Sequence, residues 1–105
     1  MTNYVFVYSG GNEDAPATEE EVAEVMAAWG AWFGTLGDAV QDGGNPFTIS
    51  KNVGPDGVND GPAGTRITGY SIVAANSIDE AVEMAKGCPV IQNGGHVSVY
   101  ETMRM

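Results

Sequence analysis

Hydrophobic side chains fill five consecutive positions near the start of the chain. Tyr4, Phe6 and Tyr8 alternate there with Val5 and Val7. Aromatic and β-branched residues favour extended backbone, so this run predicts a strand. Successive side chains of a strand point to opposite faces, so both faces of this strand are apolar. We therefore expect helices of the same chain to cover one face and a second copy of the chain to cover the other.

The next apolar residues recur at helical spacing instead of alternating. Thr18 and Glu21 form a capping box in front of them, in which the Thr18 hydroxyl accepts from the Glu21 amide. The pattern predicts a helix over residues 18–36. Gly30 and Gly34 lie inside it and each costs about 1 kcal/mol relative to Ala, which suggests that a backbone or a ligand approaches there. The apolar positions are Val22, Val25, Met26, Trp29, Trp32, Phe33 and Leu36.

Turn residues divide the second half of the chain into three further strands and one helix. The strands are predicted over residues 47–51, 67–74 and 96–101. Ser77 and Glu80 form a second capping box, and Gly87 and Pro89 end the helix that it opens. The side chains that this helix is expected to bury are Ile78, Ala81, Val82 and Ala85.

The order strand, helix, strand, strand, helix, strand predicts a ferredoxin-like α+β fold. Right-handed crossovers place both helices on one face of a four-stranded antiparallel sheet. The 105 residues fit a single domain over 1–105. The uncovered second face of the sheet favours a homodimer.

Charge restricts the possible partners. The chain has 14 acidic residues against 4 Lys and Arg, a net charge of −10. Nucleic acid and anionic membrane surfaces need clustered cations, so neither is an expected partner. No basic, apolar leader and no run of about 20 apolar residues is present, so we expect neither a signal peptide nor a membrane span. Cys88 is the only cysteine, which together with the missing leader predicts a cytoplasmic location.

Several short motifs, taken in order, resemble one known family. They are Asp60-Gly61-Pro62, Gly69-Tyr70, Ser77-Ile78-Asp79-Glu80-Ala81, Cys88-Pro89 and the closing stretch from Gly95 to Glu101. In this order they are similar to the YCII-related family, also called DGPF-domain proteins.

The resemblance implies a dimeric α/β barrel, in which two ferredoxin-like sheets stack face to face. It also implies a His–Asp pair, suggested for some enzyme-like members, and chemistry on small organic molecules, since a few relatives act in the breakdown of aromatic compounds. Ala63 departs from the family pattern, which has Phe after Asp-Gly-Pro.

His96 and Asp60 are the candidate catalytic residues. His96 is the only histidine, and an imidazole that titrates near neutral pH can act as a general acid or base. Asp60 can orient it or take a substrate proton. The alternatives are a strand-edge histidine with an ordinary hydrogen bond and a turn aspartate that bonds its own backbone.

Aromatic residues suggest a substrate pocket between the sheet and the helices. Trp29 aligns with the buried stripe of the first helix, whereas Trp32 is offset and points to a cleft or an interface. Such a pocket suits a small apolar or aromatic ligand. Its candidate lining residues are Tyr8, Trp32, Asn45, Tyr70 and Tyr100.

The sequence predicts neither a metal nor a cofactor. One His and one Cys make no ligand spacing, and no glycine-rich nucleotide fingerprint follows a strand. Cys88 follows a helix C-terminus, which disfavours a thiolate, so we interpret it as structural. Two functions remain open: a cofactor-independent lyase, isomerase or hydrolase that uses His96, and a non-catalytic dimeric module that binds a small molecule or regulates.

Overall fold

The computed structural model describes residues 1–10 and 18–103. Its elements, in chain order, are β1 (Thr2–Gly10), α1 (Glu19–Leu36), the 3-10 helix η1 (Gly37–Ala39), β2 (Val40–Asp42), β3 (Lys51–Gly54), β4 (Gly57–Asp60), β5 (Ile67–Ala75), α2 (Ile78–Ala85), α3 (Pro89–Gln92) and β6 (Gly95–Glu101). Both capping boxes begin their helices as predicted. Thr18 accepts from the Glu21 amide at 3.1 Å, and Ser77 accepts from the Glu80 amide at 3.1 Å.

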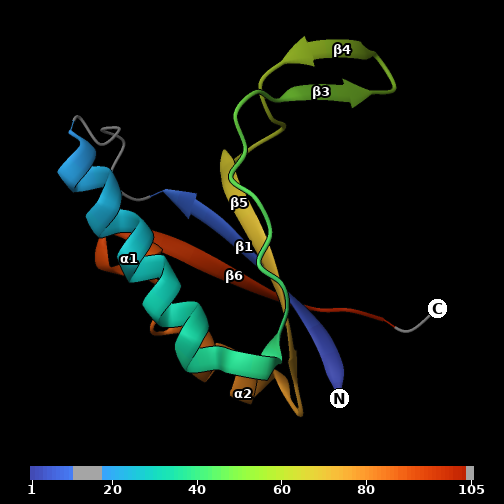
Figure 1. Ribbon diagram of the computed structural model, residues 1–105. Helices are drawn as coiled ribbons and strands as arrows, with labels where there is room; N and C mark the ends of the chain where they lie inside the picture. The colour runs from blue at the N-terminus through green and yellow to red at the C-terminus, as the bar shows by residue number, and fades with distance from the viewer. Residues whose placement is uncertain (11–17, 104–105) are drawn as a thin grey trace.

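Four strands form one antiparallel sheet in the order β2-β5-β1-β6 (Figure 1). The α+β class and the four-stranded antiparallel sheet are confirmed, and the arrangement is compatible with a ferredoxin-like fold. β1 lies in the interior of the sheet and is bonded to β5 on one side and to β6 on the other. Both of its apolar rows therefore lie in the middle of the sheet, one on each face.

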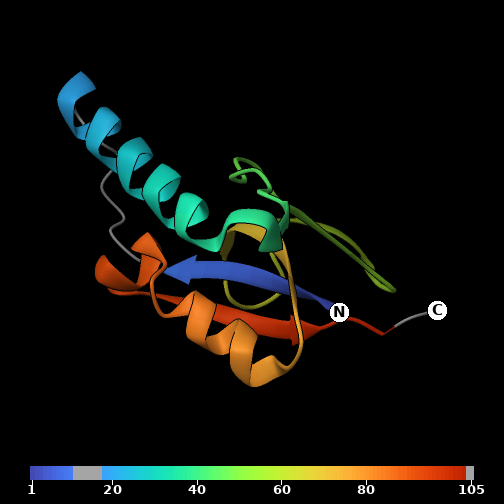
Figure 2. The ribbon, with the colours of Figure 1, turned by 60° about the horizontal axis from the view of Figure 1, so that its bottom comes forward.

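The core lies between one sheet face and the helices. Tyr4, Phe6 and Tyr8 of β1 are buried in one cluster with Trp32 of α1 and with small residues of α2, including Ala81. Both helices therefore cover the same face. The first turns of α1 extend past the tip of β1 in both ribbon views (Figures 1 and 2).

The second strand of the sheet is not where the sequence predicts it. The prediction of residues 47–51 was wrong: β2 is Val40–Asp42, and only a single bridge, Pro46 to Gly69, continues the edge toward residue 47. Between them the chain turns at Gly44, where φ is +75° and a side chain would overlap the carbonyl oxygen of Tyr70. Glycine is therefore required here, and the edge strand is interrupted.

A separate hairpin, β3 with β4, was not predicted. Lys51 pairs with Asp60 and Val53 with Val58 around the Pro55-Asp56 turn, in a sheet of its own. Figure 1 shows the hairpin projecting beyond the start of β5. Val53 and Val58 are 75% and 63% exposed, so no part of the described chain covers them.

Some predicted helix contacts are also absent from the described residues. Val22, Val25 and Met26 of α1 are exposed, as are Ile78 and Val82 of α2. A Cβ at Gly30 or Gly34 would meet nothing within 4 Å, so the close approach predicted there does not occur within the described chain.

Candidate functional site

The sheet separates the predicted site residues into two groups. Tyr8 lies on the face that the helices cover, together with Trp32 of α1. Tyr70 pairs with Val7, and Tyr100 pairs with Val5, so both point to the opposite face. We call this opposite face the open face. The described residues therefore do not form one pocket lined by all five predicted residues.

Tyr8 is a structural residue in a buried hydrogen-bond relay. Its hydroxyl donates to Ser71 Oγ at 2.7 Å, and Ser71 donates to the Gly43 carbonyl at 2.7 Å. Burial raises the pKa of Tyr8 above its usual value of 10.0. Ser71 is fully buried and was missed from the sequence, because a serine inside an apolar strand carries no signal of its partner.

The roles predicted for the two tryptophans are reversed. Trp32 is 6% exposed and its indole nitrogen donates to the Met84 carbonyl at 2.9 Å, whereas Trp29 is only partly buried. The bond satisfies a carbonyl in the last turn of α2. Gly87 allows this contact, since a Cβ there would lie 3.3 Å from the indole ring. Trp32 therefore fastens α1 to α2.

The open face has an apolar centre with a polar side along β6. Val5, Val7 and Ile72 occupy the middle of the sheet and are partly buried. On β6, Tyr100 stands opposite Val5, Ser98 opposite Val7, and His96 opposite Ser9. Tyr100 is 60% exposed. The predicted alignment of His96, Ser98 and Tyr100 on one face is confirmed by this register, but the face is the one away from the helices.

Tyr70 and Asn45 lie at the β2 edge of the open face. The Tyr70 ring stacks on Phe47 with centroids 5.8 Å apart and an interplanar angle of 25°. Asn45 is exposed, and its carbonyl lies against Gly69, where a Cβ would come within 3.2 Å. Its side chain has no hydrogen bond to a described residue, so it is available to a ligand.

Asp60 does not meet His96 within the described chain. Its carboxylate accepts from Lys51 Nζ at 2.6 Å across the β3–β4 hairpin, and it is 91% exposed. His96 stands at the start of β6, in a different sheet. No hydrogen bond or ion pair joins Asp60 to His96 among the described residues. Asp60 is instead paired with Lys51.

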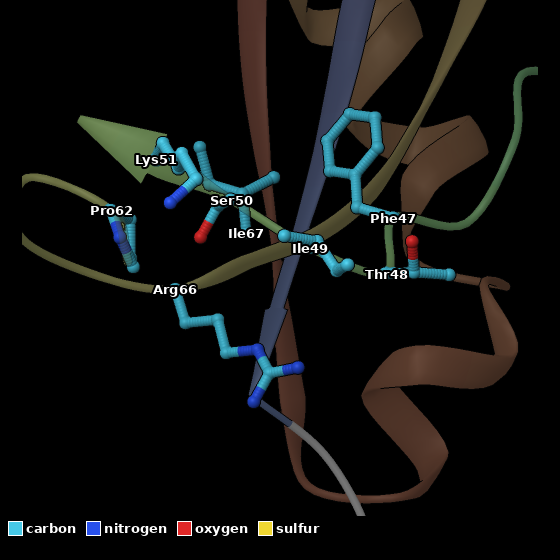
Figure 3. Close-up of a pocket in the computed structure, with 8 residues that line it drawn as sticks. All are labelled: Phe47, Thr48, Ile49, Ser50, Lys51, Pro62, Arg66 and Ile67. Carbon is cyan, nitrogen blue, oxygen red and sulfur yellow. The ribbon is translucent and has the colours of Figure 1, made fainter. Parts of the chain in front are cut away.

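A cleft opens beside Tyr70, between the two chain segments that lead to and from the hairpin. Residues 47–51 form one wall, and Pro62, Arg66 and Ile67 form the other (Figure 3). Its volume is about 240 Å³. None of the predicted site residues lines it, although Pro62 belongs to the Asp60-Gly61-Pro62 motif on which the family resemblance rests. A second hollow, between α1 and α3, is lined by Trp32, Gly87 and their neighbours.

One comparison with known proteins identifies the chain's family. The family model of the YCII-related domain matches residues 7–105. The chain belongs to the YCII-related family. The comparison with curated proteins gives no match. The match begins within β1 and covers the other described strands, the helices and the hairpin, so the hairpin is part of the YCII-related domain as this chain builds it.

The described part of this YCII-related domain holds no group of three or more His, Cys, Asp or Glu side chains that could bind a metal. No helix within residues 1–10 and 18–103 is long and apolar enough to cross a membrane. Cys88 is fully buried, and burial raises the pKa of its thiol to about 11, which makes it a poor nucleophile.

Proposed function

We propose that this YCII-related protein is a small enzyme that needs no cofactor and transfers a proton to or from a small organic substrate through His96. A single observation carries the proposal: the only histidine stands on the open face, beside Ser98 and next to an apolar surface formed by Val5 and Val7. An imidazole can exchange a proton at neutral pH, and the apolar surface can hold the body of the substrate. A lyase, isomerase or hydrolase would use these groups.

The proposal places the reaction on the open face and not in the sheet–helix cleft. The helix side of the sheet is filled by Phe6, Tyr8 and Trp32, whose rings contact one another. The open face is covered by nothing in the described chain. We therefore propose that the active form is a homodimer, in which a second sheet covers this face and excludes water from the substrate.

Asp60 is not needed in this scheme, because its carboxylate is bonded to Lys51. Tyr100 and Tyr70 offer hydroxyl groups on the same face as His96 and are the proposed substrate contacts. Asn45 offers an amide at the β2 edge. The single cysteine supports a cytoplasmic location for this reaction.

Proton transfer can be tested before the substrate is known. The protein is incubated in D₂O with a panel of small lactones and carboxylic acids that have an apolar or aromatic body, and deuterium incorporation at carbon or product formation is followed by NMR. Native protein should act on at least one compound, and His96→Gln should abolish the reaction. Asp60→Asn should keep it. A reaction that survives in His96→Gln would contradict the proposal.

A non-catalytic binding module is the second candidate. The observation that favours it is that no carboxylate contacts His96 among the described residues, whereas many general bases are oriented by one. In that case panel compounds would bind the open face, as seen by shifts of the Tyr70 and Tyr100 signals, and none would incorporate deuterium or form product.

A further inference from the structure

We propose that the cleft between residues 47–51 and residues 62–67 binds the anionic end of a small organic acid, and that Arg66 receives this anion. The inference deepens the proposed function, because it names the class of molecule that would reach His96. For the chemistry it rests on that function, but the binding itself does not depend on His96.

Two backbone hydrogen bonds join the two segments, one at each end of the cleft. The Phe47 amide donates to the Thr68 carbonyl at 2.8 Å, and the Gly61 amide donates to the Ser50 carbonyl at 2.9 Å. Between these bonds the two segments separate. The volume of about 240 Å³ lies below the range of about 300–1,000 Å³ that is typical of larger ligands. The ligand is therefore small.

The walls of the cleft are apolar, with a few polar groups. Phe47, Ile49 and Ile67 supply apolar surface, and all three are exposed to solvent. Thr48 and Ser50 add hydroxyl groups on the same segment. In Figure 3 the Arg66 guanidinium extends to one side of the cleft, away from Phe47 and Ile49. This combination suits a molecule with an apolar body and one charged end.

The charge at the cleft is opposite to that of the protein. Of the three Lys and Arg side chains in the described residues, Lys51 and Arg66 line this cleft. The third, Lys86, is bonded to Glu83 on α2 at 2.7 Å. Lys51 is neutralised by Asp60, whereas Arg66 makes no ion pair with a described residue. A guanidinium with free donors binds a carboxylate through two parallel hydrogen bonds.

The Arg66 end of the cleft lies one strand away from His96. Ile67, next to Arg66, pairs with Ser9 of β1, and Ser9 pairs with His96 of β6. Neighbouring strands lie about 4.8 Å apart, so Ile67 and His96 stand about 10 Å apart across β1. Figure 3 shows the Arg66 side chain extending from the start of β5 toward the tip of β1. An acid bound in the cleft would thus have its charged end, held at Arg66, on the side toward His96.

Binding can be measured with benzoate as the probe and benzamide as its neutral analogue. Dissociation constants are obtained by NMR titration of the native protein, following the Phe47 and Ile67 signals. Benzoate should bind at least about tenfold more tightly than benzamide, because a charged hydrogen-bond pair is lost in the amide. Arg66→Gln should raise the dissociation constant of benzoate about tenfold and leave that of benzamide unchanged.

Two control variants test whether the effect is specific to Arg66. Lys86→Gln removes the same charge from a surface away from the cleft, and it should leave benzoate binding unchanged. His96→Gln should also bind benzoate as the native protein does, so a failure of the catalytic proposal would not affect this result. Absence of benzoate binding to the native protein, or equal affinity in native protein and Arg66→Gln, would overturn the anion site.

Discussion

At the scale of single residues, Trp32 is the side chain on which the helix layer depends most. It contacts Phe6 in a stacked geometry with ring centroids 6.1 Å apart, and it bonds the carbonyl of Met84. Trp29 packs on the edge of Tyr8 but keeps part of its surface in water. The two residues therefore differ in how much apolar contact each would lose on truncation.

We expect Trp32→Ala to lower the free energy of unfolding by about 3–5 kcal/mol, because it leaves a cavity in a packed core and removes the indole hydrogen bond to the Met84 carbonyl. Trp29→Ala should cost clearly less, since water already reaches its ring. Urea denaturation of the two variants at one protein concentration measures the difference. Equal losses would show that Trp29 is as important to the core as Trp32.

Cys88 gives the protein a dependence on alkaline pH. Burial raises the pKa of its thiol from 9.0 to about 11 in the folded protein, so the unfolded chain loses this proton first. The contribution of the buried, protonated thiol to the free energy of unfolding is fully present below pH 9 and is lost as the pH rises toward 11. Its loss amounts to about 2–3 kcal/mol over that window. Burial of Tyr8 adds a loss of the same sign above pH 10.

The measurement is the urea midpoint of native protein and Cys88→Ala between pH 8 and 11. The variant should show a smaller decline than the native protein, although it is less stable at pH 8 because a buried side chain is shortened. Parallel curves for the two proteins would mean that the thiol ionises equally readily in the folded and in the unfolded protein.

At the scale of elements, the parts that local chemistry determines were predicted well. The capping boxes at Thr18 and Ser77 depend on residues within one helical turn, so the start of each helix could be read directly. The parts that depend on distant partners were not. The edge strand β2 is Val40–Asp42 because Gly44 packs against Tyr70, a contact between residues far apart in the chain.

The candidate site residues were assigned to one pocket, although they lie on two faces of the sheet, for a similar reason. Tyr8 and Tyr70 look equivalent in the sequence, but the pairing of β1 with β5 puts Val7, and not Tyr8, opposite Tyr70. The register also shifts between Tyr8 and Ser9, which no residue pattern within one strand reveals. Within β6, in contrast, alternation alone was sufficient to align His96 with Tyr100.

Deletion of the β3–β4 hairpin should leave the rest of the fold intact. Its strands pair only with each other, and the Gly61 amide bonds the Ser50 carbonyl at the point where it leaves the rest of the chain. Replacing residues 51–60 by Asn-Gly turns this bond into that of a two-residue β-turn. We expect the free energy of unfolding to change by less than about 1 kcal/mol, as for other surface loops.

Urea denaturation at a fixed protein concentration tests this expectation, with circular dichroism as the check that the shortened chain folds. A loss well above about 1 kcal/mol would mean that the hairpin packs on something besides itself. Since Val53 and Val58 are exposed in the single chain, that something would be a second copy.

At the scale of the whole molecule, the chain is thin and extended for its length. Its principal extents are 44 × 42 × 20 Å, and its radius of gyration is 15.0 Å, against about 13 Å for a compact domain of this size. The shortest extent corresponds to one sheet and one helix layer. A second sheet on the open face would add the missing layer and cover Val5, Val7 and Ile72.

We therefore expect a homodimer in light scattering at micromolar concentration, with twice the mass of the chain. Ile72→Glu places a charge in the middle of the open face, where a covering sheet would have to bury it, so this variant should be monomeric. Ile78→Glu is the matched control. It makes the same replacement at an exposed position in the first turn of α2, where an acidic residue suits the helix dipole, and it should remain dimeric. A monomeric native protein, or an Ile72→Glu variant that still forms the dimer, would show that the open face is not the interface, and the substrate would then meet His96 on a surface exposed to water.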